Sequence, residues 1–117
     1  MTARLATLLG DPVLLKQMGA ASRRKGKAGE NHVARAFTDA GHTVMQLQRN
    51  RSDMADLLVN GRYYVDAKNH NRWQLGEWLP EIERITPDGS VPVLAVKKSG
   101  GKWWAVLPLD ALVELKL

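Results

Sequence analysis

A carboxylate and an ammonium stand two residues apart in the stretch YYVDAKNH, residues 63–70. The three residues before this pair are strand formers, and side chains two apart on a strand project from one face, about 6.6 Å apart along the chain. Asp66 and Lys68 therefore lie side by side, while Val65 and Ala67 point to the opposite, apolar face. A single D-x-K pattern of this kind is most often a solvated strand face, so its meaning depends on what accompanies it.

Among the acids that precede this strand, three are candidates for the same site, namely Glu30, Asp53 and Asp56. Glu30 falls three and four residues before apolar positions of a predicted helix, which places it on the helix face that leans toward the sheet. Asp56 opens a predicted strand. Carboxylates brought together repel one another unless a cation lies between them. A Glu near a helix start also has a simpler role as a partner of the helix dipole.

Hard oxygen ligands without cysteine or a histidine cluster favour Mg²⁺, with Mn²⁺ as the alternative, over Zn²⁺. A carboxylate-bound metal beside a lysine suits phosphodiester hydrolysis. The metal polarises the phosphate and acidifies water, and the ammonium orients the attacking water and offsets negative charge. Glu30, Asp66 and one of Asp53 and Asp56 are the candidate ligands, with Lys68 beside them.

The choice between the two aspartates depends on a hairpin. Asn60-Gly61 is the strongest short-range hairpin signal. With a two-residue turn, Asp56 would pair with Val65 and face away from Asp66. A bulge or a longer loop would restore the phase. Otherwise Asp53, which has the matching parity, takes the place of Asp56.

The remaining chain must supply the elements that position these residues. The order helix, three strands, helix, two strands, helix predicts an α/β fold around a mixed sheet. Pro80 should kink or split the second long helix, and the apolar run over 91–98 suits a central strand buried on both faces. The predicted ranges are two short helical pieces within 2–20, a loop over 22–30, a helix over 31–41, strands over 42–48, 55–59 and 62–68, a helix over 72–85, strands over 91–98 and 103–109, and a helix over 110–117.

The composition limits the classes of protein. The chain has 117 residues, 44% of them apolar, which suits one globular domain. It contains no cysteine, which excludes disulfides and thiol nucleophiles. No apolar run approaches the roughly 20 residues of a membrane span, so a soluble cytoplasmic protein is expected. A net charge of +5 favours an anionic partner, most commonly nucleic acid.

Two basic segments lead into the acids. We predict that they form a phosphate-binding rim, and a charge run that only improves solubility is the alternative. The residues concerned are Arg23, Arg24, Lys25 and Lys27 before Glu30, and Arg49 and Arg51 before Asp56.

Four tryptophans, Trp73, Trp78, Trp103 and Trp104, suit either base stacking or core packing. Core packing is expected for Trp78 and for one of the adjacent pair, because neighbours on a strand face opposite ways. The exposed member of the pair is a candidate for a dimer contact.

The segments KGKAGENHVARAF, ADLLVNGRYYVDAKNHNRWQLGEW, PVLAVKK and WWAVLPLDAL together resemble the PD-(D/E)XK nuclease superfamily. Within it they are most similar to small phage and archaeal-type Holliday-junction resolvases. The resemblance runs from about Arg23 to the C-terminus, which makes residues 1–22 an N-terminal helical extension and 23–117 the nuclease domain. The helical Glu, the hairpin Asp and the (D/E)-x-K pair of the family fall on Glu30, Asp56, Asp66 and Lys68.

This resemblance implies a restriction-endonuclease-like core, with a mixed central β-sheet flanked by helices. The "ADL" context favours Asp56 over Asp53, and Gln74 stands where related nucleases place a polar helper. The implied function is a Mg²⁺-dependent endodeoxyribonuclease that acts as a homodimer on branched DNA, the four-way junction. In a phage-encoded protein the site of action is the host cytoplasm. The alternatives are a flap, restriction-like or RNA-processing nuclease, or a DNA-binding module that does not cut.

Overall fold

The computed structural model of the protein describes residues 12–47 and 54–115, with side chains from Arg24 onward. Its element order is the one that the sequence predicts. The elements are α2 (Pro12–Asp39), β1 (Val44–Gln46), β2 (Leu57–Val59), β3 (Tyr63–Asn69), α3 (Leu75–Ile85), β4 (Val91–Lys97), β5 (Trp104–Val106) and α4 (Leu109–Glu114).

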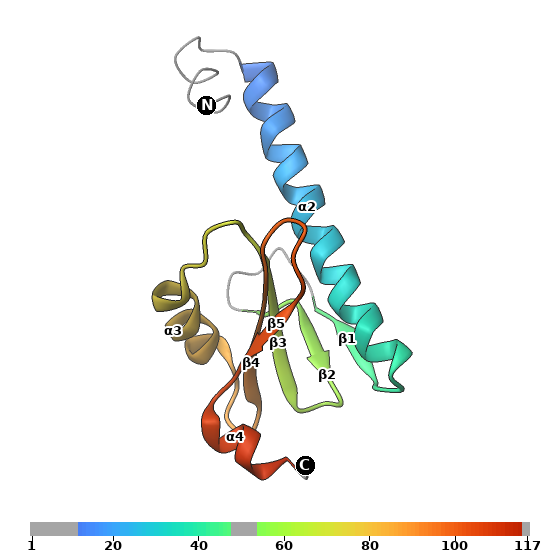
Figure 1. Ribbon diagram of the computed structural model, residues 1–117, viewed down its shortest axis with the longest axis vertical. Helices are drawn as coiled ribbons and strands as arrows, with labels where there is room; N and C mark the ends of the chain where they lie inside the picture. The colour runs from blue at the N-terminus through green and yellow to red at the C-terminus, as the bar shows by residue number, and fades with distance from the viewer. Residues whose placement is uncertain (1–11, 48–53, 116–117) are drawn as a thin grey trace.

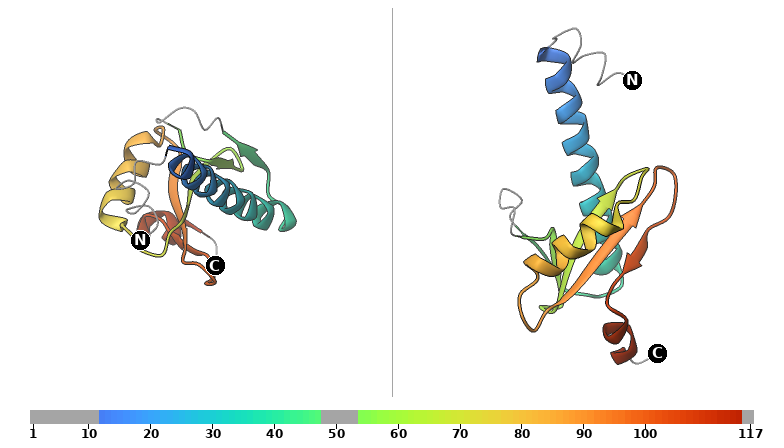
Figure 2. Two further views of the ribbon diagram at one scale, coloured as in Figure 1. Left: turned by 90° about the horizontal axis from the view of Figure 1, so that it is seen from above. Right: turned by 90° about the vertical axis from the view of Figure 1, so that its left-hand side faces the viewer.

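The five strands form one mixed sheet in the order β1-β2-β3-β4-β5. β3 and β4 are parallel, and the other neighbours are antiparallel. A parallel pair needs a crossover connection, and α3 supplies it on one face of the sheet while α2 covers the other (Figures 1 and 2). The predicted α/β class and mixed sheet are confirmed.

β4 is an interior strand between β3 and β5, and it is buried on both faces as its apolar run predicts: Val91, Val93 and Ala95 belong to the core under α2, and Leu94 and Val96 are buried on the opposite face. The core under α2 contains Val33 and apolar residues of β2, β3 and β4. The core under α3 contains Ala55, Tyr64 and Ile82. Within the described parts of the chain, no helix is long and apolar enough to span a membrane.

The predicted loop over 22–30 is wrong, because α2 runs through it without interruption. Glycine costs about 1 kcal/mol relative to alanine inside a helix, but the arginines, lysines and alanines of this stretch are good helix formers. Gly29 also allows close packing, since a Cβ there would lie 3.3 Å from Cη2 of Trp103. The helix therefore crosses the predicted domain boundary at residue 22, which stays a prediction, and its N-terminal half extends beyond the sheet (Figure 1).

The β2–β3 hairpin has a three-residue connection, because Val59 pairs with Tyr63. Asn60 and Gly61 both adopt positive φ, at 55° and 65°, and the Arg62 amide donates to the Val59 carbonyl at 3.1 Å. The longer connection, one of the two solutions that the sequence left open, is the one observed.

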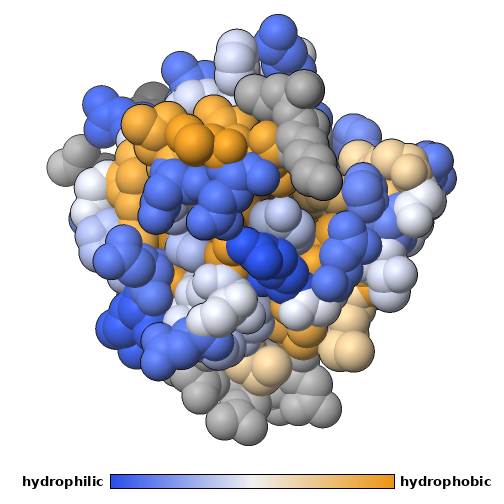
Figure 3. Space-filling view, turned by 90° about the horizontal axis from the view of Figure 1, so that it is seen from below, coloured by the Kyte–Doolittle hydropathy of each residue, from blue (hydrophilic) through white to orange (hydrophobic). Residues whose placement is uncertain are grey.

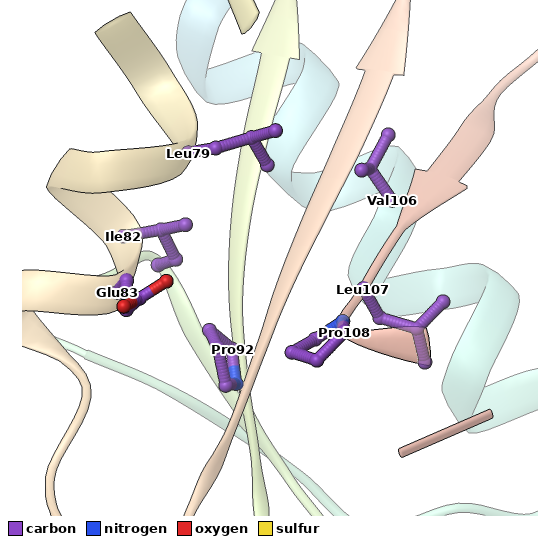
Figure 4. Close-up of a pocket in the computed structure, with 7 residues that line it drawn as sticks. All are labelled: Leu79, Ile82, Glu83, Pro92, Val106, Leu107 and Pro108. Atoms are coloured by element: carbon purple, nitrogen blue, oxygen red, sulfur yellow. The ribbon is translucent and has the colours of Figure 1, made fainter. Parts of the chain in front are cut away.

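α3 is shorter than predicted and is not split by proline. Pro80 is exposed and lies inside the helix, where it removes one backbone hydrogen bond without ending the element. Ile82 is the buried residue of this helix. Near it, a small groove of about 190 Å³ lies between α3 and the segment after β5 (Figure 4).

The two ends of the parallel pair differ in character. We call the end at Asn69 and Lys97 the carboxyl end and the end at Tyr63 and Val91 the amino end. α4 lies at the amino end, where Arg62 pairs with Glu114 at 3.1 Å. Figure 3 views the molecule from this side and shows hydrophobic patches among hydrophilic residues. Apolar side chains of α4 and the residue after it are exposed here, namely Leu109, Leu112, Val113 and Leu115.

Candidate active site

Asp66 and Lys68 lie side by side on the face of β3 that α3 covers. Their neighbours Val65 and Ala67 belong to the core under α2, as the strand alternation predicts. Lys68 Nζ lies 3.3 Å from Asp66 Oδ2, and the two side chains are 31% and 18% exposed. The pair is thus partly shielded from water but remains open to a ligand.

Asp56 immediately precedes β2 and lies where the β2–β3 ladder ends. Continuing the register from Leu57 and Val65 by one residue places Asp56 opposite Asp66, on the same face. Its Oδ2 accepts a hydrogen bond from the Ala67 amide at 2.9 Å. A side-chain oxygen thereby takes the place of a ladder carbonyl, which holds this carboxylate between the two strands.

Glu30 reaches the same end of the sheet from the other side. α2 runs antiparallel to β3, since Gly29 packs against Asn69 and Phe37 lines a groove with Tyr63. Glu30 therefore leaves the helix at the level of the last residues of β3. Its side chain is completely buried, and its Oε2 lies 2.7 Å from Lys27 Nζ. The inward-leaning orientation predicted for this acid is confirmed.

The donor chemistry of these acids fits a hard divalent cation, because all are carboxylates and Asp56 and Asp66 lie on the same face at the end of the β2–β3 ladder. Each acid also has a local partner within the protein: Lys27 for Glu30, the Ala67 amide for Asp56 and Lys68 for Asp66. Among the described residues, no three Asp, Glu or His side chains converge closely enough to hold a metal ion. Asp53, the alternative ligand, lies outside the described residues.

His70, Trp78 and a second lysine, Lys25, lie near the Asp66–Lys68 pair. His70 follows β3 and lies 5.0 Å from the Trp78 ring, and Lys68 Nζ lies 5.8 Å above the same ring. Burial, and then the charges of Lys68 and Lys25, hold the pKa of His70 below its usual value of 6.5. Lys25 of α2 and Lys68 of β3 therefore act on the same small region.

The other predicted DNA-binding residues fall into two groups. Arg24, Lys25 and Lys27 are exposed on α2. The side chain of Arg23 and the whole of Arg49 and Arg51 lie outside the described part of the structure.

Gln74 is the N-cap residue of α3, and its carbonyl accepts from the Glu77 and Trp78 amides. Its exposed side chain makes no capping hydrogen bond. The role of this residue as a polar helper stays a prediction.

Three lysines at the carboxyl end were not among the residues predicted to bind DNA. Each lies over a tryptophan ring, with Nζ-to-centroid distances of 5.8 Å for Lys97 on Trp103, 5.4 Å for Lys98 on Trp73 and 4.7 Å for Lys102 on Trp104. The local signal was the run KKSGGKWW, in which lysines flank a glycine turn. The pairing of Trp73 with Lys98 joins segments 25 residues apart and has no local signal.

Comparison with known proteins supports the fold. No protein-family model and no curated protein sequence matches the chain. The architecture is that of a restriction-endonuclease-like α/β fold. It is similar to the structure of Hjc, a Holliday junction resolvase from the archaeal hyperthermophile Archaeoglobus fulgidus, with a TM-score of 0.53 and 16% sequence identity over 69% of this chain and 73% of that one. At this identity the likeness concerns the fold, and in that respect the resemblance inferred from the sequence is confirmed.

Proposed function

We propose that this protein is a divalent-metal-dependent endonuclease that cuts branched DNA, with the four-way junction as its main substrate. The observation that carries this proposal is the placement of Asp56 and Asp66 on one face at the end of the β2–β3 ladder, with Lys68 Nζ 3.3 Å from Asp66. This arrangement occurs on a fold similar to that of a Holliday junction resolvase.

In this proposal, Asp56 and Asp66 would hold Mg²⁺, with Mn²⁺ as an alternative, and Glu30 would join them as the third ligand once its carboxylate leaves Lys27. The bound metal would neutralise charge on the scissile phosphate and acidify a water molecule. Lys68 donates to an anionic phosphate oxygen or to the attacking water, because its ammonium lies beside Asp66 on the accessible face. Lys25, on α2, binds the phosphate backbone near His70.

Resolution of a four-way junction requires two nicks in opposed strands, and one domain of this size supplies one site. A C2 homodimer supplies two sites in the required relation. The exposed apolar residues of α4 offer a surface for that contact, since Leu109 and Val113 are 73% and 72% exposed.

Leu109→Glu with Val113→Glu should convert the dimer to a monomer in light scattering and should replace paired nicks by single ones. A wild-type monomer at micromolar concentration would contradict this assembly.

A second candidate function is a DNA-binding module that does not cut. It is favoured by the bond between Lys27 and Glu30 at 2.7 Å, because this lysine already neutralises the acid that the metal would need. In such a module, the basic residues would bind DNA while the acids serve the structure.

Incubation of the full chain with labelled four-way junction, flap and linear duplex, each with Mg²⁺, with Ca²⁺ and with chelator, separates these candidates. The proposed nuclease cuts the junction in Mg²⁺ and only binds it in Ca²⁺, which fills oxygen sites with looser geometry. Preferential cutting of the flap would support the related-nuclease alternative. Binding without cutting in Mg²⁺ and Mn²⁺ would support the DNA-binding module.

A further inference from the structure

A groove lined by tryptophan and lysine lies at the carboxyl end, and none of the candidate active-site residues lines it. Its lining residues are Trp73, Lys98, Gly101, Lys102 and Trp104, and its volume is about 390 Å³. Pockets of about 300–1,000 Å³ accommodate small organic groups. One wall comes from the loop between β3 and α3, and the other from the turn between β4 and β5 together with Trp104, the first residue of β5; the loop and the turn lie at the same end of the sheet (Figures 1 and 2).

The two walls are held together and the turn is well defined. The Asn71 side chain accepts a hydrogen bond from the Ser99 amide at 3.0 Å, which joins the two segments. The Gly101 amide donates to the Lys98 carbonyl at 2.9 Å, and a Cβ at Gly101 would lie 3.3 Å from that oxygen. A side chain at Gly101 would therefore crowd the turn that forms one wall of the groove.

The lining combines two chemical features. Trp104 is 53% exposed, so its ring is available to a ligand. The ammonium groups of Lys102 and Lys98 lie 4.7 Å and 5.4 Å from the ring centroids of Trp104 and Trp73. A flat aromatic group that stacks on either ring would thus carry an attached anion close to a positive charge. Nucleotides have this combination, and aromatic side chains in a basic groove are the usual means of binding unpaired bases.

The position of the groove relates it to the candidate active site. Asn69 pairs with Lys97, so the segments that carry Trp73 and Lys98 begin immediately beyond the ends of β3 and β4. Asp66 lies three residues before the end of β3, about 10 Å along the strand. A DNA strand that passes Asp66 and continues past the carboxyl end would reach the groove within a few nucleotides.

We propose that this groove binds an unpaired nucleotide next to the branch point, with its base stacked on the exposed ring of Trp104 and its phosphate near Lys98 or Lys102. The inference rests on the proposed function. It adds that the protein recognises branched DNA by an unpaired nucleotide at the branch point. A base pair at the branch point of an open junction lacks one stacking neighbour and therefore opens at a lower cost than a base pair inside a linear duplex, so the groove favours branched over linear DNA.

The test is a binding cycle in chelator, where no cutting occurs. Wild type and Trp104→Ala are titrated by fluorescence anisotropy with two branched DNAs that differ only at one unpaired position, thymidine in one and an abasic residue in the other. Wild type should prefer the thymidine by about 5- to 150-fold, and Trp104→Ala should lose the preference. Trp104→Phe, which keeps an aromatic ring, should retain most of it, and Met45→Ala, an equally exposed position on the edge strand β1, should retain all of it.

Three outcomes would overturn the inference: equal wild-type affinity for the two DNAs, an unchanged preference in Trp104→Ala, or a change of oligomeric state in that variant, which would make Trp104 a subunit contact. Nicking in Mg²⁺ is assayed separately. A lost preference in Trp104→Ala from a protein that never nicks would support the groove and reject the nuclease. Junction nicking without any base preference would reject the groove and support the nuclease.

Discussion

The two ends of the parallel pair β3–β4 differ in what their side chains do. At the amino end, Val91 and Val93 are buried, and exposed apolar side chains of α4 lie beside the exposed ion pair of Arg62 and Glu114. At the carboxyl end, the same two strands continue into Lys68, His70 and Lys98. Loops that follow parallel strands are free of the packing that fixes the strands themselves, which is why ligand sites gather at carboxyl ends. The candidate active site and the buried apolar residues that stabilise the fold therefore occupy different parts of the same two strands, only a few residues apart.

The largest test of this contrast removes charge from the carboxyl end. Asp66→Asn and Lys68→Ala should each lower junction nicking by at least about 100-fold, the loss typical of a deleted electrostatic group. Junction affinity should change little, because binding depends on the two basic segments that precede Glu30 and Asp56. Asp88→Asn, in an exposed turn at the amino end, is the matched control and should cut normally. Full cleavage by Lys68→Ala would remove Lys68 from the mechanism.

The next test concerns the end of the β2–β3 ladder. Asp56→Asn keeps an oxygen that can accept from the Ala67 amide but removes the charge, so nicking should fall by about 100-fold while the fold is retained. Asp53→Asn should only weaken nicking. Thermal melts verify that both variants fold. The reverse order of the two activities would make Asp53 the ligand.

A smaller effect is expected from the basic residues of α2. Replacing Arg23, Arg24, Lys25 and Lys27 by alanine should weaken binding to every DNA shape and reduce the slope of log K against log salt by roughly 0.9 for each lost phosphate contact. Arg62→Ala, at the amino end, should leave the slope unchanged. A quadruple variant with the wild-type slope would mean that this side of α2 does not contact DNA.

The smallest expected effect is a change in the pKa of His70. His70 should titrate below pH 6.5 in NMR, and Lys68→Met should raise its pKa because one of the positive charges is removed. Since the folded pKa lies below the unfolded one, the contribution of His70 to stability is present above pH 6.5 and is lost as the pH falls through the folded pKa. Lys102→Met, whose charge does not act on His70, should leave its pKa unchanged. A His70 pKa above 6.5 in wild type would contradict the crowding of positive charge at this end.

Residues that depend on local alternation could be predicted from the sequence. The D-x-K pair needs only the two-residue period of a strand, and the order of the helices and strands along the chain follows from short-range patterns. The hairpin phase could be reduced to two choices but not decided, because positive φ at Asn60 and Gly61 fits a two-residue turn as well as the observed three-residue one.

Features that depend on distant contacts could not be predicted. Residues 22–30 contain two glycines, which suggests a loop, but Gly29 is required by the close approach of Trp103, more than 70 residues later. The groove of tryptophan and lysine also depends on a contact between segments that are distant in the sequence. Trp73 meets Lys98 because β3 and β4 are parallel neighbours, and no pattern near either residue indicates that pairing.

The continuity of α2 has a consequence for the energetics of association. A basic loop that closed on DNA would lose conformational freedom, at about 1–2 kcal/mol for each residue ordered. Lys25, Lys27 and Glu30 stand on a helix that has already lost this freedom on folding. In the proposed complex with DNA, the charges of Lys25 and Lys27 would therefore meet the phosphate backbone without an ordering penalty on the main chain, and the spacing between these lysines and the buried Glu30 would be the same before and after binding.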